Sequence, residues 1–139
     1  MEARMRVEGR CLCGGIVYEA EVEPGTASIC HCSDCQRQSG SVFRMNISAP
    51  ADTFRLLKGT PKIYLKISER GNRRLHAFCA TCGGPVYSSA AENAQAYSLR
   101  VGALEQRYEL QKPARQIWTK GRFAWLPPIE GTEEFVGQP

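Results

Sequence analysis

The stretch CLCGGIVYEAEVE, residues 11–23, places two cysteines and a pair of glycines directly before a run of alternating residues. Apolar side chains recur at every second position of this run, and most of the positions between them carry glutamate. A period of two predicts a half-buried β-strand, here over residues 14–23, and the Pro24-Gly25 pair after it predicts a turn. The side chains expected on the buried face are Ile16, Tyr18, Ala20 and Val22.

The rest of the chain also favours strands, because short runs of β-branched and aromatic residues alternate with turn residues. Helical periodicity is poor, and it predicts only one or two turns at residues 33–38, where Ser33 is a candidate cap, and near residues 51–54. This pattern is typical of an all-β protein, and it leaves open a sandwich, a barrel or small stacked sheets. The further strands predicted are 27–30, 42–47, 62–67, 75–78, 85–87, 97–101 and 116–119.

Length and composition predict one domain. A chain of 139 residues can bury a core of its own, so we expect a single domain over residues 1–139. Apolar residues make up 42% of the chain and charged residues 23%, which are values of a globular protein and argue against disorder. The segment 127–139 is rich in Pro, Gly and Glu and is expected to form a tail or a wrap.

The N-terminal residues carry scattered charges where a secretory signal would need an apolar run, and no later stretch is apolar enough to span a membrane. We therefore expect a cytoplasmic protein with no membrane partner. In that reducing compartment, seven cysteines at CxC and CxxC spacings favour metal binding or catalysis over a disulfide framework. If all seven are thiolates on two Zn²⁺ ions, the formal net charge of +4 becomes +4 − 7 + 4 = +1. Nucleic acid is therefore not the expected partner.

The seven cysteines form three groups, of two, three and two. FCATCGG has the CxxC spacing of a zinc knuckle, and the glycine after Cys82 relieves the tight turn. CLCGG carries the same glycine, and in an extended CxC both cysteines share one side while Leu12 faces away. Joining the two pairs predicts a closed, structural zinc site made of Cys11, Cys13, Cys79 and Cys82.

Cys30, Cys32 and Cys35 of the stretch CHCSDC remain as a set of three. Three protein ligands with an open fourth position are typical of a catalytic or exchangeable zinc. Other divisions stay open: two cysteines of this set with one of the pairs, which would leave a CxC or CxxC for redox work, or a second structural zinc completed by another side chain. His31 is a weaker candidate ligand because it points to the other face of an extended segment. Asp34 is expected to be a solvated turn residue rather than a proton acceptor.

In order along the chain, GRCLCGGIVYEA, CHCSDCQRQSG, FCATCGGPVY and IWTKGRFAW resemble the glutathione-dependent formaldehyde-activating enzyme family, which includes the related domain of centromere protein V. The resemblance runs from about residue 7 to about residue 126 and includes all seven cysteines. It implies a β-tent fold of small stacked antiparallel sheets, with one zinc at the four-cysteine site and a second at the three-cysteine site. It also implies a carbon-sulfur lyase that joins formaldehyde to glutathione as S-hydroxymethylglutathione, with Cys30, Cys32 and Cys35 as its catalytic centre.

Glutathione carries two carboxylates and one ammonium group, so its site needs cationic anchors. A zinc held by three thiolates has a net charge of −1 and is a poor Lewis acid, so it is expected to deliver the thiol rather than to polarise the aldehyde. Ser39-Gly40 is a candidate for bringing backbone near the ligand, and Trp118 or Trp125 for walling the pocket. The protein is expected to be a monomer or a homodimer. The candidate anchors are Arg37, Gln38, Arg44, Arg70, Arg73 and Arg74.

Two alternatives come from other functional classes. One is a zinc module with two structural sites that binds chromatin or protein without catalysis, which would need a basic stripe on its surface. The other is a thiol redox protein, in the manner of the methionine-R-sulfoxide reductases, whose fold is similar and which carry a four-cysteine zinc. A redox role would need at least one cysteine that is a reactive nucleophile instead of a ligand.

Overall fold

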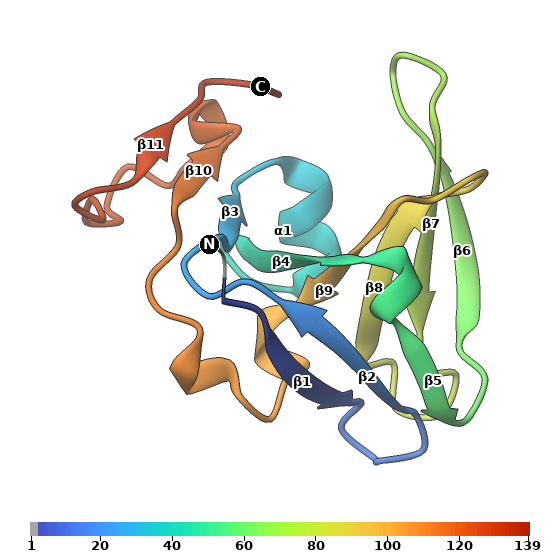
Figure 1. Cartoon of the computed structure of the whole chain (residues 1–139). Helices are drawn as coiled ribbons and strands as arrows, with labels where there is room; N and C mark the ends of the chain where they lie inside the picture. The colour runs from blue at the N-terminus through green and yellow to red at the C-terminus, as the bar shows by residue number, and fades with distance from the viewer. Residues whose placement is uncertain (1–2) are drawn as a thin grey trace.

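Two β-sheets of unequal size make up the computed structural model, which describes residues 3–139 (Figure 1). The smaller is antiparallel and has the order β1-β2-β5, from β1 (Met5–Arg10), β2 (Val17–Val22) and β5 (Arg55–Lys58). The larger has the order β11-β10-β3-β4-β9-β8-β7-β6. Its strands are β3 (Ser28–Cys30), β4 (Arg44–Pro50), β6 (Lys62–Ile67), β7 (Arg73–Phe78), β8 (Pro85–Ala90), β9 (Ala96–Arg100), β10 (Arg115–Ile117) and β11 (Glu133–Glu134). The predicted mainly β fold with stacked sheets is confirmed.

The hydrophobic core lies between the two sheets. The alternation predicted for β2 is confirmed, because Tyr18, Ala20 and Val22 are fully buried, as is Ile16 just before the strand. Phe54 adds an aromatic cluster, with its ring centroid 5.3 Å from that of Tyr18 and 4.7 Å from that of Tyr97. Each such aromatic pair adds about 0.5 to 1.5 kcal/mol beyond the area that it buries. The core therefore holds the small sheet against the large one.

The strand register gives the larger sheet two unlike faces. Because side chains alternate along a strand, residues paired across neighbouring strands share a face. One row, Ile47, Leu99, Tyr87 and Ala77, is apolar and belongs to the core or packs against it. The next row, on the opposite face, is polar: Ser48, Ser98, Ser88, His76 and Tyr64. Figure 1 shows α1 (Ser33–Ser39) lying over β4 and β9, between β3 and β7.

Helical structure is limited to α1 and to single 3₁₀ turns, and both predicted positions, 33–38 and 51–54, are confirmed. The cap of α1 differs from the prediction. Cys32, not Ser33, is the N-cap, since its backbone is extended (φ −66°, ψ 157°) and its Sγ accepts the N–H of Cys35. None of the helices within residues 3–139 is long and apolar enough to cross a membrane. The 3₁₀ turns are Ala51–Thr53, Val101–Ala103, Arg107–Glu109 and Thr119–Gly121.

Several boundaries and pairings differ from the sequence prediction. Cys11 to Gly14 form a hydrogen-bonded turn, with the N–H of Gly14 donating to the carbonyl of Cys11 at 3.1 Å, so the CxC is not extended and β2 starts only at Val17. Leu12 nevertheless faces away, with 84% of its surface exposed. β10 pairs in parallel with β3 and β11, so the large sheet is mixed rather than antiparallel.

Three strands were missed. β1 carries three charged residues in six, β5 is exposed at all four positions, and β11 has only two residues. β5 and β11 do not show the alternation that marks β2, whereas β1 alternates Met5, Val7 and Gly9 with charged residues and was overlooked. Each exists because a neighbouring strand supplies hydrogen-bonding partners for its backbone.

Candidate metal centres and active site

The cysteines at 11, 13, 79 and 82 lie together where the loop after β1 meets the loop after β7. Their Sγ atoms are all within 4.8 Å of one another, and that of Cys13 is 3.6 Å from Cys11 and 3.7 Å from Cys79. Sulfurs bound to one tetrahedral zinc at about 2.3 Å would be about 3.8 Å apart. A disulfide would need about 2.0 Å. The four thiols are therefore spaced for one metal ion, and zinc fits this donor set.

Two matching turns shape this four-cysteine site. The glycine after the second cysteine of each pair has φ 76°, in the left-handed region that glycine adopts without strain. The N–H of the next residue, Gly15 or Gly84, donates to that second cysteine at 3.4 Å. Backbone N–H groups of Cys13 and Gly84 lower the pKa of Cys82 to about 6. These turns therefore favour thiolates, the form in which cysteine binds metal. The two glycines are Gly14 and Gly83.

The second group, Cys30, Cys32 and Cys35, lies at the junction of β3 and α1. Cys30 ends the strand, Cys32 caps the helix, and Cys35 is in the first turn, which brings their Sγ atoms within 4.8 Å of one another. Hydrogen bonds from the thiols of Cys30 and Cys35 lower the pKa of Cys32. No fourth His, Cys, Asp or Glu completes this set in the part of the chain that the structure describes. The three sulfurs could hold a metal that keeps one position open.

His31 lies outside both cysteine groups. The residue is 1% exposed, and its Nε2 lies 2.7 Å from Oε1 of Gln116. Its ring packs edge-on against that of Phe43, with the two centroids 5.6 Å apart. It therefore acts as a packed, hydrogen-bonded histidine rather than as a fourth ligand. Asp34 forms an ion pair with Lys66 across the gap between α1 and β6.

Two residues, Gln36 and Gly121, hold the loop that carries the three cysteines. Gln36 donates from Nε2 to the carbonyls of His31 at 3.1 Å, Val42 at 3.3 Å and Gly121 at 3.0 Å. Gly121 approaches so closely that a Cβ there would lie 2.5 Å from the carbonyl oxygen of His31. The segment after β10, through Gly121, therefore packs against the three-cysteine loop and restricts its position.

Three arginines gather on the polar face of the larger sheet, beside this loop. Arg44 of β4 is paired in register with Cys30, and Arg100 of β9 is paired with Asn46, two residues further along β4. Arg100 is 5% exposed and donates to Oδ1 of Asn46 at 2.7 Å. Arg74 of β7 donates to the hydroxyl of Ser88 at 3.2 Å. We call Arg44, Arg74 and Arg100 the arginine cluster.

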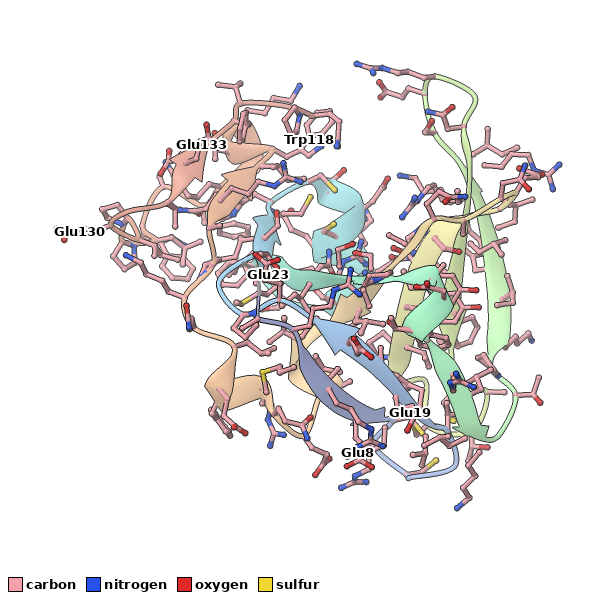
Figure 2. The ribbon with its side chains drawn as sticks, in the orientation of Figure 1. Glu8, Glu19, Glu23, Trp118, Glu130 and Glu133 are labelled. Carbon is pink, nitrogen blue, oxygen red and sulfur yellow. The ribbon has the colours of Figure 1, made fainter. Side chains whose placement is uncertain are left out.

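The arginine cluster has no carboxylate partner. Within residues 3–139, no ion pair of 4.0 Å or less joins any of its members to Asp or Glu. Of the glutamates labelled in Figure 2, Glu8 and Glu19 lie on the small sheet and Glu130 and Glu133 on the C-terminal segment. The polar face is therefore strongly cationic.

The electrostatics of the face follow from this crowding. Burial, then the charge of Arg44, lowers the pKa of Arg100 to about 9, and burial, then the charge of Arg100, lowers the pKa of His76 to about 4. The charge of Cys35 acts in the opposite direction on Arg100. Negative charge at the three cysteines therefore stabilises the arginine cluster, and the cluster stabilises thiolates.

A groove of about 300 Å³ opens between α1 and β6, next to the polar face. Its walls carry both signs of charge: Asp34, Arg37, Gln38, Tyr64 and Lys66. Tyr64 and Lys66 are paired in register with His76 and Arg74, so the groove continues onto the same face.

The predicted anchors separate into three groups. Arg37 and Gln38 line the groove, whereas Arg44 and Arg74 belong to the arginine cluster. Arg73 points to the other face and lies 3.6 Å from Glu92, and Arg70 is exposed in the loop between β6 and β7. The sequence reasoning missed Arg100, His76 and Lys66. Their positions in alternating strands were a signal, but only the strand order reveals which of them share a face with the cysteines.

The other candidates near the cluster have local roles. Gly40 is the C-cap of α1 with φ 67°, and the hydroxyl of Ser39 donates to the carbonyl of Phe43. Trp118 has a left-handed backbone (φ 56°), and its Nε1 donates to Gln138 at 3.1 Å. Trp125 is 69% exposed, with its ring edge against Phe123.

Comparisons with known proteins agree with this fold. A crystal structure of a Rhodobacter sphaeroides protein matches with a TM-score of 0.59 and 26% identity, over 76% of this chain and 96% of that one. No curated protein matches the chain. The model of the glutathione-dependent formaldehyde-activating enzyme family matches residues 6–121, which contain all seven cysteines. The chain therefore belongs to the glutathione-dependent formaldehyde-activating enzyme family.

Proposed function

We propose that this protein is a zinc-dependent carbon-sulfur lyase that interconverts a small thiol and formaldehyde with their S-hydroxymethyl adduct, glutathione being the leading candidate thiol. The observation that carries the proposal is the incomplete three-cysteine set, which faces the arginine cluster. The four-cysteine site, by contrast, has a full set of ligands and matches a structural role. Family membership supports an enzyme that acts on glutathione and formaldehyde.

In this proposal the chain acts as one domain with two zinc ions, one on Cys11, Cys13, Cys79 and Cys82 and one on Cys30, Cys32 and Cys35. A zinc at the second site would supply an electrophilic position that favours the deprotonated form of a substrate thiol. The seven free thiols suit a reducing compartment such as the cytoplasm.

The reaction balances without another reactant. The thiol loses its proton, its sulfur forms a bond to the carbon of formaldehyde, and the carbonyl oxygen takes up a proton to become the hydroxyl of the adduct. Lyase action reverses these steps. Ionisation alone supplies at most about 1.5 to 2 kcal/mol for a thiol of pKa near 8.5, so holding the two reactants together must supply the rest.

The residues around the cysteines are suited to that positioning. Gln36 and Gly121 fix the loop, Arg44 favours the thiolate of Cys35, and the groove offers the cation of Arg37 to a carboxylate of the substrate. These contacts hold the cysteine loop and orient the substrate. None of them acts as a general acid or base.

The test combines exchange kinetics with metal analysis. We expect the protein to accelerate exchange between formaldehyde, glutathione and S-hydroxymethylglutathione, measured by NMR exchange spectroscopy, and Cys32→Ser to abolish the acceleration while leaving the fold intact. Two zinc ions per chain are expected, with one released or newly liganded on addition of glutathione. Background exchange by the fully loaded protein would refute the proposed activity and favour a module with two structural sites. A rapidly reacting cysteine in the loaded protein would favour the redox alternative.

A further inference from the structure

Arg100 is the most deeply buried cation of the polar face, and residues 3–139 supply no carboxylate to it. Its guanidinium has one neutral acceptor at 2.7 Å, on Asn46, and one weak contact at 3.4 Å, with Nδ1 of His76. Its Nε has no partner, and neither does the buried Nε of Arg44. A buried charge that has no partner costs several kcal/mol, so a protein keeps such a group only where a partner is supplied.

The three cysteines do not balance this charge. The arginine cluster contributes +3, and three thiolates with one divalent zinc would contribute −3 + 2 = −1, which leaves +2. Lys66 adds nothing to this sum because it is paired with Asp34. His76 is neutral at physiological pH, since its pKa is lowered to about 4. The face can therefore accept anionic groups beyond those that the described part of the chain, residues 3–139, provides.

The positions of the arginines point to an anion close to the reacting sulfur. Arg44 is one strand away from Cys30 and Arg100 is two strands away, and neighbouring strands are about 4.8 Å apart. A guanidinium binds a carboxylate through two parallel hydrogen bonds, and the unpartnered Nε atoms leave such donors available. A carboxylate a few bonds from a thiol would reach the cluster while its sulfur lies at the three cysteines.

We propose that Arg44, Arg74 and Arg100 form a carboxylate-binding subsite that selects thiols bearing an anionic group over neutral or cationic thiols of the same size. The inference rests on the proposed function, since the subsite would serve the thiol substrate of that reaction. Its test is independent of that function, because carboxylate binding can be measured without turnover. Arginines bind the oxyanions of carboxylates and of phosphates alike, so the test must also distinguish a carboxylate from inorganic phosphate.

The experiment is a charge series measured by titration calorimetry on the full-length, metal-loaded protein. The probes are 3-mercaptopropionate, 2-mercaptoethanol and cysteamine, which are small thiols of charge −1, 0 and +1, together with propionate and inorganic phosphate. We expect 3-mercaptopropionate to bind at least tenfold more tightly than the two other thiols. Propionate should bind more weakly than 3-mercaptopropionate but detectably, and it should compete with it.

Arg74→Gln and Arg73→Gln form a matched pair of variants. They remove the same charge from adjacent positions of β7, but only Arg74 belongs to the cluster, whereas Arg73 is an exposed partner of Glu92. Arg74→Gln should weaken 3-mercaptopropionate at least tenfold and leave 2-mercaptoethanol within twofold, while Arg73→Gln should change neither. Circular dichroism and thermal unfolding establish that both variants are folded. Arg44→Gln is the second cluster variant, should Arg74→Gln fail to fold.

The outcomes separate the subsite from the reaction. Equal affinity for the three thiols, or equal losses in the two variants, would overturn the subsite even if exchange of formaldehyde is catalysed. Phosphate binding more tightly than either carboxylate would overturn the carboxylate assignment. Propionate binding that depends on Arg74, in a protein that does not accelerate exchange, would retain the subsite and refute the proposed activity.

Discussion

The two cysteine groups differ in how the chain completes them. The four-cysteine site joins the end of β1 to the end of β7, so it links the small sheet to the large one, and glycine turns aim backbone N–H groups at its sulfurs. The three-cysteine site lies within a single strand-to-helix connection, and its N–H contacts come from that same connection, for example from Cys35 to Cys32. One group is a cross-link between distant segments, and the other is a local cluster that faces a cationic surface.

This difference suggests different roles for the two groups: the four-cysteine site in the stability of the fold, and the three-cysteine site in the reaction. A metal that bridges two sheets restricts the unfolded chain over about seventy residues, so its binding energy contributes to folding. A metal held by residues 30 to 35 would close only a short loop, so we expect both sheets to stay in place when it is removed. We therefore expect the same substitution, cysteine to serine, to have unequal consequences in the two groups.

The largest expected effect comes from Cys79→Ser. It removes a ligand of the bridging site, and we expect the loss of one metal ion and a fall in Tm on the order of 10 °C or more. Cys32→Ser should lose the other metal ion while Tm changes by only a few degrees. Thermal unfolding and elemental analysis of both variants measure the contrast. Equal falls in Tm would show that the second site is structural as well.

A second prediction concerns the brace on the three-cysteine loop. Gly121→Ala would place a Cβ 2.5 Å from the carbonyl oxygen of His31, so backbone must shift, at a cost of about 1 to 3 kcal/mol in the free energy of unfolding. We expect weaker metal binding at the three-cysteine site only, measured by competition with a chelator.

Gly102→Ala is the matched control for this substitution. Nothing lies within 4 Å of a Cβ at that position, so the variant should behave as the wild type. Unchanged metal release from Gly121→Ala would mean that the segment after β10 does not support the site.

The smallest expected effect is a pH dependence from His76. Its pKa in the folded protein is about 4, below the ordinary value of 6.5, because of burial and the charge of Arg100. The unfolded chain therefore takes up a proton near pH 6.5, whereas the folded chain does not until about pH 4. Stability is lost as pH falls through this window, on the order of 1 kcal/mol after solvent screening of the partly buried ring. The free energy of unfolding in urea should change less between pH 7 and pH 5 for His76→Gln than for the wild type. Equal changes in the two proteins would show that the cationic face does not lower the pKa of His76.

Much of the fold was predictable because its signals are local. The alternation from Ile16 to Val22 matches the buried face of β2, and the glycines after Cys13 and Cys82 adopt the left-handed turns that their spacing suggested. Even where the predicted geometry was wrong, as for the extended CxC, the sulfurs of Cys11 and Cys13 still lie 3.6 Å apart. Cysteine spacing tolerates such errors because a thiol pair can meet through either a turn or a strand.

The positions of the arginines could not be predicted from the sequence around each of them. The sequence suggested six anchors beside the cysteines in the chain, but Arg70 and Arg73 lie elsewhere, and Arg100, which was not named, is the most buried of the cluster. Arg44, Arg74 and Arg100 come from β4, β7 and β9, which share one sheet face only because of the order β4-β9-β8-β7. A sequence pattern fixes which side of its own strand a residue occupies, but not which strand lies beside it.

The sequence by itself therefore determined the mainly β class, the grouping of the seven cysteines and the family, since each depends on residue types at short and regular spacings. Only the tertiary structure decided that the three-cysteine loop faces an arginine cluster to which no carboxylate of residues 3–139 is paired, and that Gly121 packs against the loop. The physical reason is that strand order is selected by burial of the whole core between two sheets. Backbone hydrogen bonds then bring together residues more than fifty positions apart.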